Sequence, residues 1–186
     1  MLVDYATHRS GLTDARVVLT MLGFHLTTDE QHAYRFKHPD GRKLDLMVAD
    51  HLPSRMQPRL DRRPAFPVPS GEQAIRRRDL YRLQFDSGES AVVGVPDELG
   101  ALVAKGAAWL VDRRDRSRHL DDAAVLLACV ADASALDYET MSKNDRRRIR
   151  AVAQELTDAA HTSWVNLDRE DRARAQFALT LMSRQL

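Results

Sequence analysis

The chain has 186 residues, with 28 basic and 27 acidic side chains and a hydrophobic content of 44%. This composition is typical of a folded globular chain of one domain, or one domain with a small appendage, and excludes a disordered one. A net charge near zero favours no class of partner, and the single cysteine excludes a disulfide framework and a cysteine-rich metal site.

The first third of the sequence predicts a helix followed by a hairpin. "LTDARVVLTMLGF" has helical apolar spacing, with Thr13 as the expected N-cap and Gly23 as the stop. "HAYRFKHPDGRKLDLMVAD" predicts a β-hairpin that turns at "HPDG" and places Asp45 on the face opposite Leu44, Leu46 and Val48. The proline-rich stretch 53–69 is expected to be a connector, because proline disrupts central strands and helices.

The remainder predicts a second hairpin and then helices. "LYRLQFDSGESAVVGV" alternates around a "DSGE" turn. Four helices are expected, at about 97–112, 120–131, 143–160 and 169–185. Strands first and helices after indicate an α+β protein, with a first domain over 1–131 and a helical C-terminal region over 132–186. Cys129, within "AAVLLACV", is expected to be a small buried hydrophobe.

Lys105 is a lysine in an apolar run of a chain with 24 arginines and four lysines. Its helical neighbours are Ala101, Leu102, Ala108 and Trp109, so its ammonium leaves an apolar surface. Either it points into a cleft and binds a phosphate as a compact charge, or its stem covers apolar area at a helix edge. The small residues around it, Gly100, Gly106 and alanines, allow a close approach of something else to this helix.

Other charged residues also allow two interpretations. Asp45 is either a ligand of a hard divalent cation or an ordinary strand residue facing solvent. Asp121 and Asp122 either belong to a site or favour the first turn of a helix through its dipole. The arginine clusters at 76–78, 113–118 and 146–150 either bind phosphate or lie on solvated helix faces.

The order of these segments resembles the AbiEii-type family of nucleotidyltransferase-like toxins, which includes the mycobacterial tRNA-modifying toxins. The segments are "LGF", "HAYRFKHPDGRKLDLMVAD", "PVPSGEQAIRRRDL" and "VPDELGALVAKGAAWLVDRRDRSRHLDDAAVLL", and they span roughly residues 23–130. The resemblance implies a polymerase-β-like nucleotidyltransferase fold with a mixed sheet and hairpins. It also implies magnesium-dependent transfer of a nucleotide from a nucleoside triphosphate to RNA, tRNA in several members, and a cognate antitoxin protein as partner.

The resemblance also assigns roles to individual residues. Lys105 matches the lysine of the family's K-x-x-A segment and would hold the triphosphate. Asp122, or Asp121 as the alternative by one residue, matches a downstream aspartate that would orient Lys105 or an arginine. Asp45 matches the third carboxylate of these enzymes, as metal ligand or base. The arginines of "DRRDRSRH" (Arg113, Arg114, Arg116 and Arg118) would face phosphates of the nucleotide or of an RNA backbone.

One family motif, a Gly-Ser or Gly-Gly turn followed by a D-x-D strand, does not occur in this sequence. Three explanations are open: the reading frame begins upstream of Met1, Asp4 or Asp14 reaches the site instead, or the protein binds nucleotide, RNA or a partner without catalysis. The last explanation makes a non-catalytic binding module the alternative function. No stretch resembles a signal peptide or has the length of a membrane span, so a cytoplasmic location without membrane partners is expected.

Overall fold

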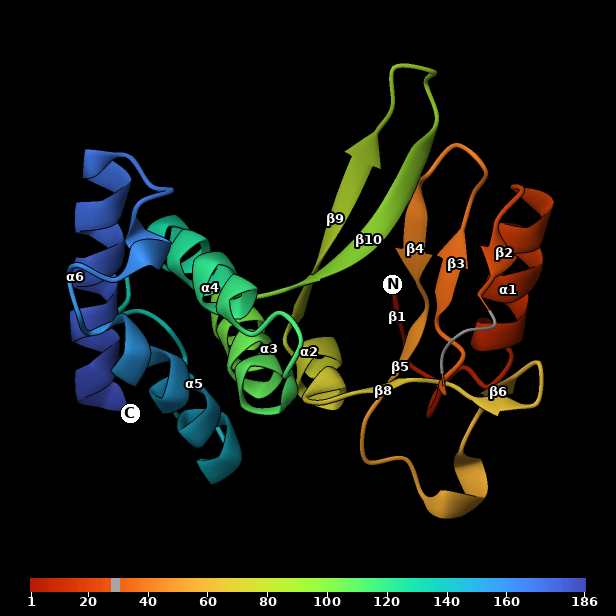
Figure 1. Ribbon diagram of the computed structural model, residues 1–186, viewed down its shortest axis with the longest axis horizontal. Coiled ribbons are helices and arrows are strands. Elements are labelled where there is room, and N and C mark those ends of the chain that lie inside the picture. Colours follow the sequence, from red (N-terminus) through yellow and green to blue (C-terminus); the bar gives the residue numbers. More distant parts are fainter. Residues whose placement is uncertain (28–30) are drawn as a thin grey trace. The chain divides into compact units, whose positions relative to one another are not determined.

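The computed structural model describes residues 1–27 and 31–186 and has an α+β fold (Figure 1). The chain divides into two compact units, Met1–Ile75 and Arg76–Leu186. This boundary does not coincide with the expected one after residue 131. Each unit has its own hydrophobic core of buried side chains.

The first unit combines short strands with one long helix. Its elements are β1 (Leu2–Val3), α1 (Gly11–Met21), β2 (His25–Leu26), β3 (Arg35–Lys37), β4 (Lys43–Asp45), β5 (Met47–Ala49), η1 (Ser54–Met56), β6 (Arg59–Leu60), β7 (Arg63–Pro64), β8 (Pro67–Val68) and, at the boundary, α2 (Gly71–Arg76). β1 and β8 flank β5 in a parallel sheet, whereas β2, β3 and β4 form an antiparallel one. Neither of these two sheets is mixed in direction: the strands joined by hairpins pair antiparallel, and the strands joined by longer segments pair parallel.

The helix and the first hairpin lie where the sequence predicts them, with one error in the capping residue. Gly23 follows α1 with φ +81°, which confirms it as the stop. Thr13, however, is inside α1, and the N-cap position is Ser10, whose side chain makes no capping hydrogen bond. The return strand of the hairpin is interrupted at Leu46, so that β4 pairs with β3 while β5 joins the other sheet.

The proline-rich connector contains short ordered pieces rather than a long element. Pro67 lies in β8, which is an edge strand of its sheet, where the missing N–H of proline costs no ladder hydrogen bond. Asp50 closes the segment by accepting hydrogen bonds from the backbone N–H groups of Ser70 (2.7 Å) and Glu72 (3.1 Å). These two hydrogen bonds therefore hold the end of the connector and the start of α2 next to Asp50, the residue that follows β5.

The second unit has a hairpin followed by a helical assembly. Its elements are β9 (Arg78–Gln84), β10 (Ser90–Pro96), α3 (Glu98–Val111), α4 (Ser117–Cys129), α5 (Lys143–Leu156), η2 (Thr162–Trp164) and α6 (Arg169–Gln185). α3 packs on α4 and α5, and α4 packs on α6. The hairpin and all four helices are confirmed, although α4 begins three residues earlier than expected. Cys129, expected to be buried, is exposed at the last residue of α4 because it lies on the outer face of that helix.

Side-chain caps explain where three of these helices start. The Asp97 carboxylate accepts a hydrogen bond from the N–H of Gly100, and that of Asp168 accepts one from Asp171. Ser142 and Asp145 form a reciprocal capping box at α5. Each cap satisfies an N–H group that has no partner within its own helix.

The β9–β10 hairpin exposes apolar side chains along its whole length. Cross-strand register places Tyr81, Leu83 and Val93 on one face, and Tyr81 is 52% exposed. Phe85 and Val95 are also exposed. An apolar surface of this kind on a two-stranded ribbon is typical of a face that another protein segment covers.

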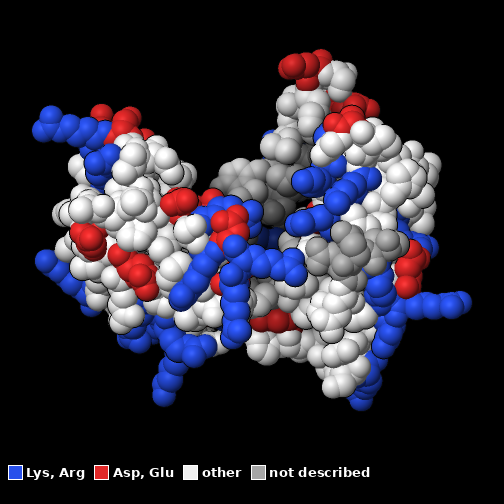
Figure 2. All heavy atoms as spheres, in the orientation of Figure 1, with Lys and Arg blue, Asp and Glu red and all other residues white. Residues whose placement is uncertain are grey.

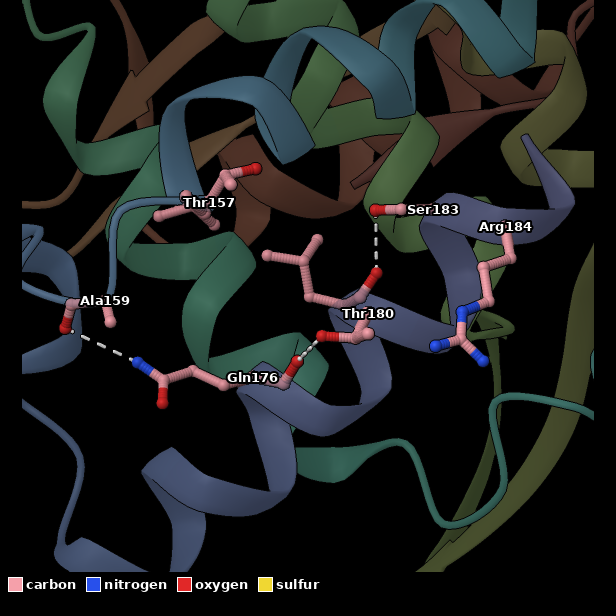
Figure 3. A pocket seen from close by; sticks show the side chains of 8 residues that line it. Thr157, Ala159, Gln176, Thr180, Ser183 and Arg184 are labelled. Carbon is pink, nitrogen blue, oxygen red and sulfur yellow. Dashed lines mark hydrogen bonds between the residues drawn. The ribbon is translucent and has the colours of Figure 1, made fainter.

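A cavity of about 500 Å³ lies between the end of α5 and α6 (Figure 3). Its three hydroxyl groups donate to the carbonyl oxygens of their own helices: Thr157 to Ala153, Thr180 to Gln176, and Ser183 to Leu179. Arg184 is the cation of its lining, and none of the site residues expected from the sequence borders it.

Among the described residues, no helix has the length and apolar character needed to span a membrane.

Candidate functional site

Lys105 and Asp122 meet where α3 packs against α4. The Nζ atom of Lys105 donates to Oδ2 of Asp122 over 2.6 Å. The two side chains are 33% and 40% exposed, so water and an incoming ligand both reach the pair. An ion pair this exposed stabilises the fold by at most about 1 kcal/mol. Its main effect is therefore to fix the position of the ammonium group.

The element that approaches the Lys105 segment closely is α5. A Cβ atom added at Gly106 would lie 2.2 Å from the carbonyl oxygen of Arg148, so the α3 and α5 backbones touch at this point. Leu102 and Trp109, which lie one turn before and one turn after Lys105, are buried in the core. Lys105 is thus held on a helix that is fixed by α4 and by α5.

The loop between α3 and α4 is ordered by one carboxylate. Oδ1 of Asp112 accepts the backbone N–H of Arg114 at 2.8 Å and that of Asp115 at 3.4 Å, while its Oδ2 lies 3.0 Å from Nε2 of His119. The Arg114 N–H, followed by His119, holds the pKa of Asp112 below its ordinary value. Because His119 is buried on α4, this carboxylate links the loop to the helix core.

The four arginines expected to face phosphates have different surroundings, although all four are exposed. The guanidinium of Arg116 stacks over the Trp109 ring, 3.6 Å from its centroid, and donates to the Trp109 carbonyl oxygen at 2.8 Å. Arg118 lies 3.7 Å from a carboxylate oxygen of Asp115. The side chains of Arg113 and Arg114 have no hydrogen bond or ion pair within the described part of the chain. Figure 2 shows basic side chains protruding where Figure 1 places this loop.

Asp121 and Asp122 are adjacent in sequence but make different contacts. Oδ1 of Asp121 accepts a hydrogen bond of 2.6 Å from the hydroxyl of Ser163, which ties α4 to η2. Successive helical residues point about 100° apart, so only one of the two carboxylates can face α3. The structure brings Asp122 to Lys105 and leaves Asp121 in a structural contact.

Asp45 lies in the first unit and is engaged by an arginine. Arg35, its direct cross-strand neighbour, donates from Nε and Nη2 to the two carboxylate oxygens, both at 2.8 Å. This bidentate geometry occupies the oxygens that a magnesium ion would need. No group of three His, Cys, Asp or Glu side chains within residues 1–27 and 31–186 could hold a metal ion. Asp45 as it stands does not fit the metal site that the resemblance implies.

Neither the pair of Asp112 and His119 nor the stacking of Arg116 on Trp109 was predicted from the sequence. Both contacts join residues seven apart across a turn, outside the three- and four-residue spacing of neighbours on one helix face. A usable signal was present, because "WLVDRRDRSRH" places an aspartate directly after an apolar helix, where it caps that helix and orders the following turn.

Comparison with known proteins adds no family: no family model, no curated protein and no solved structure matches this chain.

Proposed function

We propose that this chain is a nucleotidyltransferase-like protein of a bacterial toxin–antitoxin system, with a polymerase-β-like fold. It would take a nucleoside triphosphate and transfer a nucleotide to RNA, with tRNA as the acceptor. The observation that supports this proposal is the 2.6 Å ion pair of Lys105 and Asp122, whose side chains are 33% and 40% exposed and lie on two helices connected by an arginine-rich loop. A positioned ammonium on a helix that leads into a loop of exposed guanidinium groups is suited to polyphosphate.

The residues of this site would act by binding and orientation. The ammonium of Lys105 has three N–H donors, and Asp122 takes one of them. The remaining donors are available to a phosphate oxygen, while Asp122 keeps the charge in place. Arg113 and Arg114 would bind further phosphates, and Arg116, stacked on Trp109, would hold the loop in shape.

Magnesium enters this proposal as the ion that accompanies a nucleoside triphosphate in solution and is bound largely through its phosphates. Asp45 would have to exchange Arg35 for the metal before it could contribute. We therefore derive no reaction step through a metal ion, and the proposal depends on the phosphate-binding residues of the second unit.

A second candidate function is a non-catalytic module that binds RNA or a partner protein. The specific observation in its favour is the Asp45 carboxylate, because both of its oxygens accept hydrogen bonds from Arg35. A cognate antitoxin protein would have an apolar surface available on the β9–β10 hairpin, where Tyr81 and Leu83 are exposed.

The test incubates the full chain with total bacterial tRNA, magnesium and each of four labelled nucleoside triphosphates. The variants are Lys105→Ala and Asp122→Asn, and the matched control is Lys43→Ala at another exposed lysine. Label on tRNA that both site variants lose and the control retains, with unchanged circular dichroism, supports transfer. Salt-dependent tRNA binding without label supports the RNA-binding form of the second candidate, and the absence of both label and binding overturns nucleotide transfer to tRNA and that RNA-binding form.

A further inference from the structure

The five cations of α5 fall into two groups. Arg146 donates to the carbonyl oxygens of Gln185 (2.5 Å) and Tyr138 (2.7 Å), and Arg148 pairs with the buried Asp145. These two arginines tie α5 to neighbouring elements of the helical unit. Their role is structural.

The other three cations are Lys143, Arg147 and Arg150, and all three are exposed. None of them makes a hydrogen bond or an ion pair through its side chain within the described part of the chain. Their spacing of four and then three residues places them along one face of the helix. Gln154, four residues beyond Arg150, continues this face as an exposed polar residue. Figure 2 shows basic side chains over the position of α5.

This arrangement does not favour the helix itself. Like charges three or four residues apart repel one another, and Lys143 is a cation in the first turn, where the helix dipole favours anions. The acid in that turn, Asp145, is buried and already paired with Arg148. Within residues 1–27 and 31–186 no carboxylate pairs with the three cations, whereas a polyanion along this face would compensate their charges.

We propose that Lys143, Arg147 and Arg150 form a track that binds the phosphate backbone of the RNA acceptor. A rise of 1.5 Å per residue spreads the three cations over about 10 Å, a length over which a nucleic acid strand presents several phosphates. A membrane surface fits less well, because interfacial helices place apolar residues beside their basic face. The apolar residues of α5, Ile149 and Val152 among them, are buried in the core instead.

The track lies in the same helical unit as the Lys105 pair. Gly106 follows Lys105, and its backbone touches that of Arg148, which follows Arg147. An RNA held along α5 would therefore be bound to a helix that packs directly on the helix that carries Lys105. In this respect the inference rests on the proposed function, but RNA binding itself can be measured without nucleotide transfer.

The test compares the full chain with a triple variant, Lys143→Gln, Arg147→Gln and Arg150→Gln. The matched control removes three other exposed cations of the second unit, Arg82→Gln, Arg169→Gln and Arg184→Gln, with the same change in net charge. Binding of total tRNA is measured by filter retention between about 50 and 200 mM salt, without nucleotide or magnesium. Vesicles of anionic phospholipid and polyglutamate serve as competitors.

The track variant is expected to bind tRNA at least tenfold more weakly at low salt. The slope of log K against log salt is expected to be smaller in magnitude by about two to three than that of the native chain. The control is expected to retain most of its affinity. Equal losses in the two variants overturn the proposal, as does stronger competition by vesicles or polyglutamate than by RNA. If no label is transferred but the track variant binds tRNA more weakly than the native chain, nucleotide transfer is refuted and the track is not. If label is transferred and the track variant has an unchanged KM for tRNA, the track is refuted and nucleotide transfer is not.

Discussion

Replacement of Gly106 by alanine tests the contact that holds the Lys105 helix in place. The new Cβ would lie 2.2 Å from the Arg148 carbonyl oxygen and 2.5 Å from its carbonyl carbon. Non-bonded atoms prefer separations of about 3.5 Å or more, so α3 and α5 would have to separate by roughly 1 Å. The neighbouring atoms are backbone and cannot rotate away, in contrast to the end of a flexible side chain.

The expected effect is a net destabilisation of about 2 kcal/mol. Overpacking against a rigid neighbour costs up to about 3 kcal/mol, and the better helix propensity of alanine recovers about 1 kcal/mol. For a chain of this length the corresponding fall in Tm is about 4–8 °C.

Tryptophan fluorescence during urea unfolding measures this change, because Trp109 and Trp164, the two tryptophans of the chain, both lie in the second unit. Ala108→Gly in the same helix is the control, since it reports mainly the propensity difference of about 1 kcal/mol. If Gly106→Ala is as stable as the native chain or more stable, the close crossing of α3 and α5 is wrong.

Three further predictions concern single carboxylates. Asp122→Asn should weaken nucleotide binding and change the free energy of unfolding by less than about 1 kcal/mol. Asp121→Asn should leave nucleotide binding intact. Isothermal calorimetry measures nucleotide binding, and urea melts measure the free energy of unfolding. Because its folded-state pKa is lowered, Asp112 stabilises the fold above its unfolded-state pKa, and this contribution is lost as the pH falls through the folded value. Acid unfolding of Asp112→Asn should accordingly show a weaker pH dependence than that of the native chain. The backbone N–H of Arg42 lowers the pKa of Asp40 to about 2, so carboxyl NMR should find it ionised at pH 3, and a midpoint near 4 would contradict the turn geometry.

Much of the fold follows from local chemistry that the sequence displays. The apolar spacing of the helices, the caps at Asp97 and Ser142 and the glycine at position 23 each act within a few residues. The first helix shows the limit, because Thr13 has the chemistry of a cap but Ser10 occupies the position. The residue at which a helix begins depends on how the preceding chain packs, and no single residue specifies that packing.

The candidate site was less predictable because its contacts join distant segments. The choice between Asp121 and Asp122 depends on the rotation of α4 about its axis, which is set by Ala123, Ala124 and Leu127 packing in the core. The engagement of Asp45 by Arg35 depends on strand register, and a shift by one residue would separate them. Spacing in the sequence shows the residue types but not these rotations and registers.

The contacts of the second unit also explain why its arginines and Lys105 have different roles. Arg77, Arg116 and Arg146 donate to backbone carbonyls, and Arg148 donates to the buried carboxylate of Asp145. At such places a planar fork with several donors joins elements that a single ammonium could not. On the proposed function, position 105 needs the opposite property, because its cation donates to one carboxylate over 2.6 Å and would keep its other donors for a phosphate. A guanidinium there could bind Asp122 through two parallel hydrogen bonds and leave less for phosphate. Lys105→Arg should therefore preserve the fold and the ion pair while it weakens nucleotide binding, and an arginine variant that binds nucleotide as well as the native chain would show that only the charge matters.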